Sequence, residues 1–193
     1  MSIQAEFYKS FANISQMEDV KSMPQIAFVG RSNAGKSSLL NMLTNRRGLA
    51  ITSQKAGRTR LINFFEIKNE YYFVDLPGYG YSSASKGTTQ GWGEAIAEYL
   101  VNSKHLRLVF ILLDIRHDPS QLDVAMLHFL QSHSIPFRIL ATKCDKLSRA
   151  QSHNHRQKLA SFLGLGIADI ILTSAQNRQG RQDVFDILEQ TLV

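Results

Sequence analysis

The feature that most constrains the fold of this chain is the stretch at residues 30–37, which reads GRSNAGKS. It follows the apolar run QIAFV (25–29) and opens an amphipathic pattern at 36–45. The spacing G-x-x-x-x-G-K-[ST] between a strand and a helix is typical of a P-loop, in which backbone N–H groups and a helix N-terminus surround phosphates. Lys36 is then expected to reach the β- and γ-phosphates and the Ser37 hydroxyl to bind Mg²⁺. The whole loop contributes Gly30, Arg31, Ser32, Asn33, Ala34, Gly35, Lys36 and Ser37.

The rest of the chain alternates short apolar runs with longer amphipathic segments. Strands are expected at 25–29, 61–67, 71–75, 108–114, 137–142 and 170–174, and helices at 36–45, 92–103, 121–132, 149–163 and 180–192. Near-continuous apolar runs such as LVFILLD suit strands that are buried on both faces. The alternation predicts an α/β fold with a doubly wound, mostly parallel, six-stranded sheet. Only KNE separates 61–67 from 71–75, which predicts a hairpin and one antiparallel edge strand.

Length and composition indicate one domain. The 193 residues suit a single core, so residues 23–193 are interpreted as the domain and residues 1–22 as an extension packed on it. A lone cysteine, Cys144, excludes an internal disulfide and fits a reducing compartment. The sequence shows no signal-peptide pattern and no apolar stretch of membrane-spanning length. A cytoplasmic protein without a membrane partner is expected, and a monomer is the default because no heptad or apolar patch stands out.

The net charge of +6 is unevenly distributed. Residues 20–65 contain eight Lys/Arg and no Asp or Glu, and residues 146–168 contain four basic residues and no acidic one. This asymmetry favours a polyanionic partner such as nucleic acid, because phosphates attract clustered cations. The alternative is that some of these charges serve the phosphate site while the rest are simply solvated.

The DLPG stretch, residues 75–78, follows the apolar run YYFVD. Asp75 is placed to hold Mg²⁺ through a water, and Gly78 to bring its N–H to a γ-phosphate with no Cβ in the way. Thr59 lies upstream in the polar segment KAGRTRL and is a candidate to close on Mg²⁺ when a γ-phosphate is present. Leu76 and Pro77 complete this part of the candidate site.

The base is indicated by TKCD, which comprises Thr142, Lys143, Cys144 and Asp145 after a buried strand. An aspartate carboxylate accepts both the N1–H and the exocyclic amine of guanine, whereas adenine would leave the charge unpaired. Thr173, Ser174 and Ala175 follow another strand, where a backbone N–H can meet the guanine O6. The order of these motifs favours a guanine nucleotide.

With these residues in view, the chain resembles the translation-factor-related GTPases, and within them the EngB family. GRSNAGKSSLLN, KAGRTRLINFF, DLPGYGY, TKCDKL and the TSA turn carry the match, which runs over about the whole chain. The resemblance implies a bacterial cytosolic GTPase that assists assembly of the large ribosomal subunit, contacts rRNA and ribosomal proteins, and is linked to cell division and septation. It implies Mg²⁺ bound by Ser37 and Thr59. Beyond the P-loop, it implies GTP contacts from Gly57, Arg58, Thr59, Arg60, Leu61, Asp75, Leu76, Pro77, Gly78, Thr142, Lys143, Cys144, Asp145, Thr173, Ser174 and Ala175.

The chain departs from the family pattern at two places. Ala56 replaces the usual proline before the switch glycine, which would loosen that loop. The base loop begins with Thr142, so any brace that an asparagine would give to the P-loop is expected to be shortened.

Hydrolysis is expected to be slow in the free protein. Tyr79 stands where many switch proteins carry a glutamine, and a phenol cannot offer a water both a carbonyl and an amide. The candidate catalytic residues are Lys36, Thr59, Gly78 and Asn33. Asn33 is a candidate to hold K⁺ against the phosphates, and the alternative is that it only tolerates a left-handed turn.

Two other functions remain open from the sequence. One is a nucleotide kinase or ATPase, which has no need of TKxD. The other is a GTP-gated binding module that acts mainly on a division protein, whose binding would be insensitive to salt because it involves no phosphate contacts.

Overall fold

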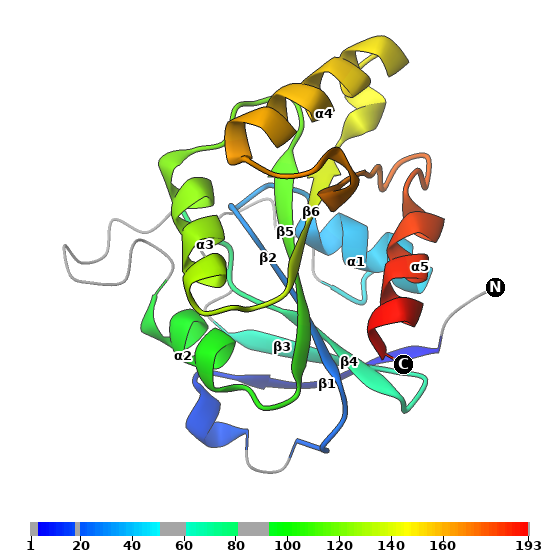
Figure 1. Ribbon diagram of the computed structural model, residues 1–193. Helices are drawn as coiled ribbons and strands as arrows, with labels where there is room; N and C mark the ends of the chain where they lie inside the picture. Colours follow the sequence, from blue (N-terminus) through cyan, green and yellow to red (C-terminus); the bar gives the residue numbers. More distant parts are fainter. Residues whose placement is uncertain (1–3, 18–19, 51–60, 81–92, 193) are drawn as a thin grey trace.

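A seven-stranded sheet is the centre of the computed structural model, which describes residues 4–17, 20–50, 61–80 and 93–192 (Figure 1). The strand order is β1-β3-β4-β2-β5-β6-β7. The strands are β1 (Ala5–Phe11), β2 (Gln25–Gly30), β3 (Ile62–Ile67), β4 (Tyr71–Asp75), β5 (Leu106–Asp114), β6 (Phe137–Thr142) and β7 (Ile170–Leu172). The helices are α1 (Lys36–Thr44), α2 (Glu94–Asn102), α3 (Gln121–Ser132), α4 (Arg149–Leu163) and α5 (Arg181–Leu192), with short 3₁₀ helices at Ile14–Gln16, Cys144–Lys146 and Ile167–Asp169.

The predicted α/β class and mostly parallel sheet are confirmed. Strands β4, β2, β5, β6 and β7 are parallel, and β3 pairs antiparallel with β4 across the predicted hairpin. The predicted boundaries of these elements agree with the structure within two residues.

The predicted number of strands was wrong, because β1 adds a seventh. Residues Ala5–Phe11, interpreted from the sequence as part of a packed extension, pair antiparallel with β3 and form the edge of the sheet. The antiparallel strand β3 therefore lies one position in from the edge. A register shift between Phe7 and Lys9 interrupts the alternation of β1, and its partner strand lies far along the chain. Both facts hide this strand from a search for local periodicity.

Helices cover both faces of the sheet, as a doubly wound fold requires. Apolar residues of α1 and α5, such as Leu40 and Leu188, pack in one buried cluster. Those of α2, α3 and α4, such as Tyr99, Met126 and Leu159, pack in a second cluster on the other face. Because the parallel strands end at the same edge, the loops that follow β2, β4, β5, β6 and β7 gather there. Among the residues described, no helix is long and apolar enough to cross a bilayer.

Candidate functional site

The P-loop connects β2 to α1 and lies close to the strand beside it. A Cβ on Gly30 would come within 2.8 Å of the Leu112 carbonyl oxygen on β5, so only glycine fits this approach. Asn33 and Gly35 both have left-handed backbone, with φ of 68° and 94°. The left-handed turn at Asn33 supports the structural interpretation of that residue and leaves its contact with K⁺ a prediction.

The phosphate end of the candidate site brings Lys36, Ser37 and Asp75 together. Asp75 is buried at the end of β4, and its Oδ1 accepts a hydrogen bond from Lys36 Nζ. Ser37 stands beside Lys36 in the first turn of α1. The Ser37 hydroxyl oxygen and the Asp75 carboxylate oxygens are ligands of the kind that suit Mg²⁺. The described residues contain no group of three or more His, Cys, Asp or Glu that would hold a metal by itself.

The DLPG segment packs directly on the P-loop. Tyr79 N donates to Gly30 O at 3.2 Å, and Ser32 N donates to Tyr79 O at 3.0 Å. A Cβ on Gly78 would come 3.1–3.2 Å from Ser32, so the glycine allows the two loops to touch. The Leu76 side chain is buried in the core, which leaves only its backbone for a ligand.

The base end of the candidate site is a pocket of about 160 Å³. It lies between the loops after β6 and β7, and Thr142, Lys143, Asp145, Thr173 and Ala175 line it together with Gly35, Ser38, Leu39, Lys146 and Gln176. The sequence placed the first five of these residues in the base site. The Cys144 side chain packs in the core instead, and burial raises the pKa of its thiol, which agrees with an inert cysteine.

Asp145 is held in place by Ser174, which lies in the loop after β7. Ser174 Oγ donates to Asp145 Oδ1 at 2.6 Å, and this bond is the main reason that the Asp145 pKa lies below its usual value. Asp145 is therefore an anionic acceptor with a fixed orientation. Such an acceptor has the chemistry that the N1–H and amine of guanine require.

Two side chains join the base loop to the P-loop. Thr142 Oγ1 donates to Ala34 O at 2.6 Å, and Lys143 Nζ donates to Asn33 O at 2.7 Å. Thr142 therefore does brace the P-loop, and the expectation that this brace is shorter than one from an asparagine stays a prediction. The buried hydroxyl reaches the P-loop carbonyl because the ends of β2 and β6 both flank β5.

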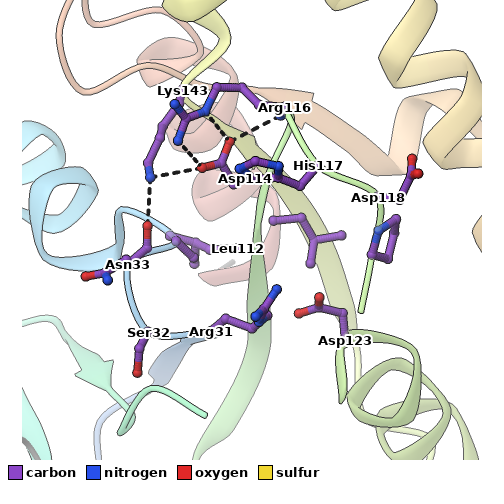
Figure 2. A pocket seen from close by; sticks show the side chains of 13 residues that line it. Arg31, Ser32, Asn33, Leu112, Asp114, Arg116, His117, Asp118, Asp123 and Lys143 are labelled. Carbon is purple, nitrogen blue, oxygen red and sulfur yellow. Dashed lines mark hydrogen bonds and ion pairs between the residues drawn. The ribbon is translucent and has the colours of Figure 1, made fainter. Parts of the chain in front are cut away.

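Asp114, which the sequence analysis did not single out, organises Lys143 from the end of β5. Figure 2 shows its carboxylate between Lys143 and Arg116, with Lys143 Nζ at 2.9 Å from Oδ2 and Arg116 Nη2 at 2.7 Å from the same atom. Partial burial alone would raise the Asp114 pKa, but the bonds from Arg116 and Lys143 outweigh it and hold this pKa below its usual value. Asp114 ends the run LVFILLD and pairs with Thr142 on β6. An acid at the end of the strand beside TKCD was the signal that could have identified it.

The structure also accounts for Tyr79, whose side chain is only 2% exposed. The phenol donates to Asp123 Oδ1 at 2.7 Å, while Asp123 Oδ2 accepts from Ser120 N and Ser120 Oγ in the capping box of α3. Asp123 and Arg31 face one cavity of about 390 Å³ beside the P-loop (Figure 2). In this arrangement Tyr79 is a structural link to α3, in keeping with the expectation that it does not aim a water.

Some predicted site residues cannot be placed. Gly57, Arg58, Thr59 and Arg60 lie outside the described residues, so the second predicted Mg²⁺ ligand stays a prediction. Leu61 is described and is 41% exposed just before β3.

The fold and the arrangement of the loops define a P-loop GTPase domain. The 50S ribosome-binding GTPase family model matches residues 25–143. A probable GTP-binding protein EngB of Clostridium kluyveri is 45% identical over 190 residues, covering 98% of this chain and 96% of that protein. The chain belongs to the EngB family of GTP-binding proteins within this class.

Solved structures support the same fold. The crystal structure of a probable GTP-binding protein engB has a TM-score of 0.66 at 23% identity and covers 87% of this chain and 98% of its own. Aquifex aeolicus Era bound to GDP·AlF4⁻ has a TM-score of 0.71 at 22% identity and covers 89% of this chain and 57% of its own. At these identities, the similarity concerns the fold alone.

Proposed function

We propose that the protein is a Mg²⁺-dependent guanine-nucleotide switch in the cytoplasm, whose GTP state docks on the large ribosomal subunit during assembly. In this role it is needed for normal cell division and septation, acts as a monomer, and hydrolyses GTP slowly until a partner completes the site. Membership of a 50S ribosome-binding GTPase family supports the partner. The observation that carries the nucleotide is the base pocket with Asp145 oriented by Ser174.

The proposed nucleotide site has two ends, and the gathering of the loops that follow the parallel strands at one edge of the sheet supports this arrangement. Lys36, Ser37 and Gly78 are assigned to the phosphates and Mg²⁺, with Asp75 holding the metal through a water. Asp145 is assigned to guanine N1–H and the exocyclic amine, and the TSA turn to guanine O6. The remaining P-loop residues and residues 57–61 complete the contacts. A bound Mg²⁺ would neutralise charge between the β- and γ-phosphates.

The first experiment tests the switch and its target together. The protein is loaded with GDP or with a non-hydrolysable GTP analogue and co-sedimented with purified large and small subunits at several salt concentrations. Analogue-dependent, salt-sensitive pelleting with the large subunit supports the proposal, because contacts with RNA phosphates weaken steeply with salt. If the protein bound neither subunit but bound a division protein, and if salt did not change that binding, the ribosomal role would be replaced by that of a GTP-gated binding module.

An Asp145→Asn variant is the matched control for the nucleotide. Its amide offers a donor where guanine also offers donors, so GTP binding should fall, whereas the 2-oxo group of xanthine can accept that donor. Subunit binding by the variant should therefore return with a xanthosine triphosphate analogue. Equal binding of ATP and GTP by the unaltered protein would favour a kinase or ATPase.

The proposed role of K⁺ rests on Asn33. Its backbone lies in a tight left-handed turn whose carbonyl is fixed by Lys143, so its amide starts from a defined place beside the phosphate loop. A cation held there would neutralise charge that develops during hydrolysis. GTP hydrolysis in K⁺ should exceed that in Na⁺ at equal ionic strength, and an Asn33→Ala variant should lose the difference. Equal rates in the two salts would remove the role of K⁺.

A further inference from the structure

Four arginines from separate parts of the sequence meet around the C-terminal end of α1. Arg46 and Arg47 follow Asn45, the C-cap of the helix, in the acid-free stretch of the sequence. Arg178 Nη2 donates to Asn45 Oδ1 at 2.6 Å, and Arg181 Nη2 donates to Leu43 O at 3.0 Å. The last carbonyls of a helix attract cations, which explains why Arg181 is drawn in. The folded chain thus concentrates positive charge at a surface that the nucleotide site does not use.

A hollow of about 330 Å³ lies at one side of this arginine cluster, where the start of β1 meets the residues after α1. β1 forms the edge of the sheet (Figure 1). The lining consists of Glu6, Phe7, Arg46, Arg47, Gly48 and Leu49. The Arg46 guanidinium donates to Ala5 O and so fixes β1 against the end of α1.

Phe7 is the unusual member of this lining. Its side chain is 55% exposed, although it contacts Phe65 edge-on with the ring centroids 6.0 Å apart. Phe7 is therefore supported from one side and open to solvent, beside two exposed arginines. Exposed aromatic rings next to clustered cations are the combination by which proteins hold unpaired nucleotides, since the ring stacks on a base and the cations bind phosphate.

We propose that this hollow binds an unpaired nucleotide of an RNA strand, with its base on Phe7 and its phosphate at Arg46 and Arg47. Glu6 accepts a hydrogen bond from an N–H group of the base, such as N3–H of uracil. Arg178 continues the positive surface beyond the hollow, where the next phosphates of the strand would lie. The charge selects a polyanion, and the exposed ring selects a free base face over a duplex, in which the bases are stacked on one another. This site rests on the proposed function, because it gives the RNA of the ribosomal partner a place to bind.

The test uses the full chain and a labelled oligouridylate of about ten nucleotides, within the range of sites bound by single-strand-binding folds. Phe7→Ala removes the stacking ring and should weaken binding about tenfold. Phe7→Tyr keeps an aromatic ring and should bind as the unaltered protein does. Arg47→Gln should make the plot of log affinity against log salt shallower by about 0.7, the value for one contact with a single-strand phosphate. Arg47 is the sharper choice, since Arg46 also holds β1. Lys104→Gln, in the α2–β5 connection, removes the same charge elsewhere and should leave the slope unchanged.

The outcomes separate this site from the proposed function. GDP affinity should be the same in all variants and each variant should unfold cooperatively, which shows that the fold is intact. Phe7→Ala binding as well as the unaltered protein, or equal binding of a duplex of the same length, would overturn the site. If the GTP-analogue form pellets with the large subunit, and Phe7→Ala and Arg47→Gln pellet as well as the unaltered protein, the site is refuted and the ribosomal role stands. If the subunit is not bound but oligouridylate still depends on Phe7 and Arg47, the site stands and the ribosomal role fails.

Discussion

Replacing Tyr79 with phenylalanine removes the hydrogen bond between the residue that follows the DLPG segment and α3. The variant removes a single oxygen from a buried side chain and keeps the ring that fills the core. The bond that it removes joins Tyr79 Oη to Asp123 Oδ1 at 2.7 Å. Burial, and then the charge of Asp123, raise the Tyr79 pKa well above its usual value, so the phenol remains a donor throughout the ordinary pH range.

The expected loss follows from the burial and charge of the acceptor. Asp123 is 5% exposed, and its other oxygen already accepts from Ser120, so water cannot readily replace the phenol. A hydrogen bond to a charged group contributes about 1.5–3 kcal/mol. The free energy of unfolding of Tyr79→Phe should therefore fall by about 2 kcal/mol. For a domain of this size, that loss corresponds to a decrease in Tm of about 4–8 °C.

Urea unfolding at pH 7 measures this loss, with an unchanged m value showing that the denatured state is the same. Tyr99→Phe is the matched control, because Tyr99 is equally buried but donates to the neutral Gln25 Oε1 at 2.9 Å, an atom that Ser103 Oγ also reaches at 2.8 Å. Its loss should stay at or below about 1 kcal/mol. If Tyr79→Phe lost no more than Tyr99→Phe, the bond to Asp123 would not hold the DLPG segment, and the reasoning would be refuted.

Three further changes test other parts of the molecule. Ser174→Ala removes the donor that orients Asp145 and should weaken GDP binding about tenfold in a fluorescence titration, the equivalent of one hydrogen bond to a charged group; an effect below about twofold would contradict the role of Ser174. The Asp114 pKa is lowered by folding, so its carboxylate stabilises the protein above its unfolded pKa of about 4, and this contribution is lost as the pH falls below that value. Unfolding free energy should therefore fall less steeply between about pH 5 and pH 3 in Asp114→Asn than in the unaltered protein, and parallel curves would count against the ion pairs. Gly180→Ala places a Cβ against the Leu172 carbonyl at a φ of +73° and should destabilise the protein by about 2 kcal/mol or more in urea, whereas a loss under about 0.5 kcal/mol would show that the loop yields.

The parts of the fold that could be predicted are those with a local signal. LVFILL is buried because its residues are apolar without a break, and TKCD begins at Thr142, the last residue of FRILAT, so the position of Asp145 needed only the end of one strand. Parallel strands deliver their following loops to one edge, which is why motifs far apart in the sequence were expected together and were found together.

What could not be predicted depends on partners distant in the sequence. β1 exists as a strand because Ala5 pairs near Ile67, and no local pattern shows that pairing. The direction of Tyr79 depends on Asp123, an acid that reads as an ordinary first-turn residue of a helix. Arg47 and Phe7 read separately as a solvated charge and an extension residue, and only the folded chain brings them to one hollow.

These distant contacts give the two ends of the candidate site different mechanical roles. Thr142 and Lys143 each reach a P-loop carbonyl, and Lys143 is itself held by Asp114, so the base loop, the P-loop and the end of β5 form one braced unit. Tyr79, which follows the DLPG segment, is tied to the same P-loop through its backbone and to α3 through its side chain. The proposed base site is thus built on contacts among strand ends, whereas a displacement of Gly78 would pull on Tyr79 and reach α3. A base site that stays rigid while the neighbouring segment transmits motion fits the proposed nucleotide switch.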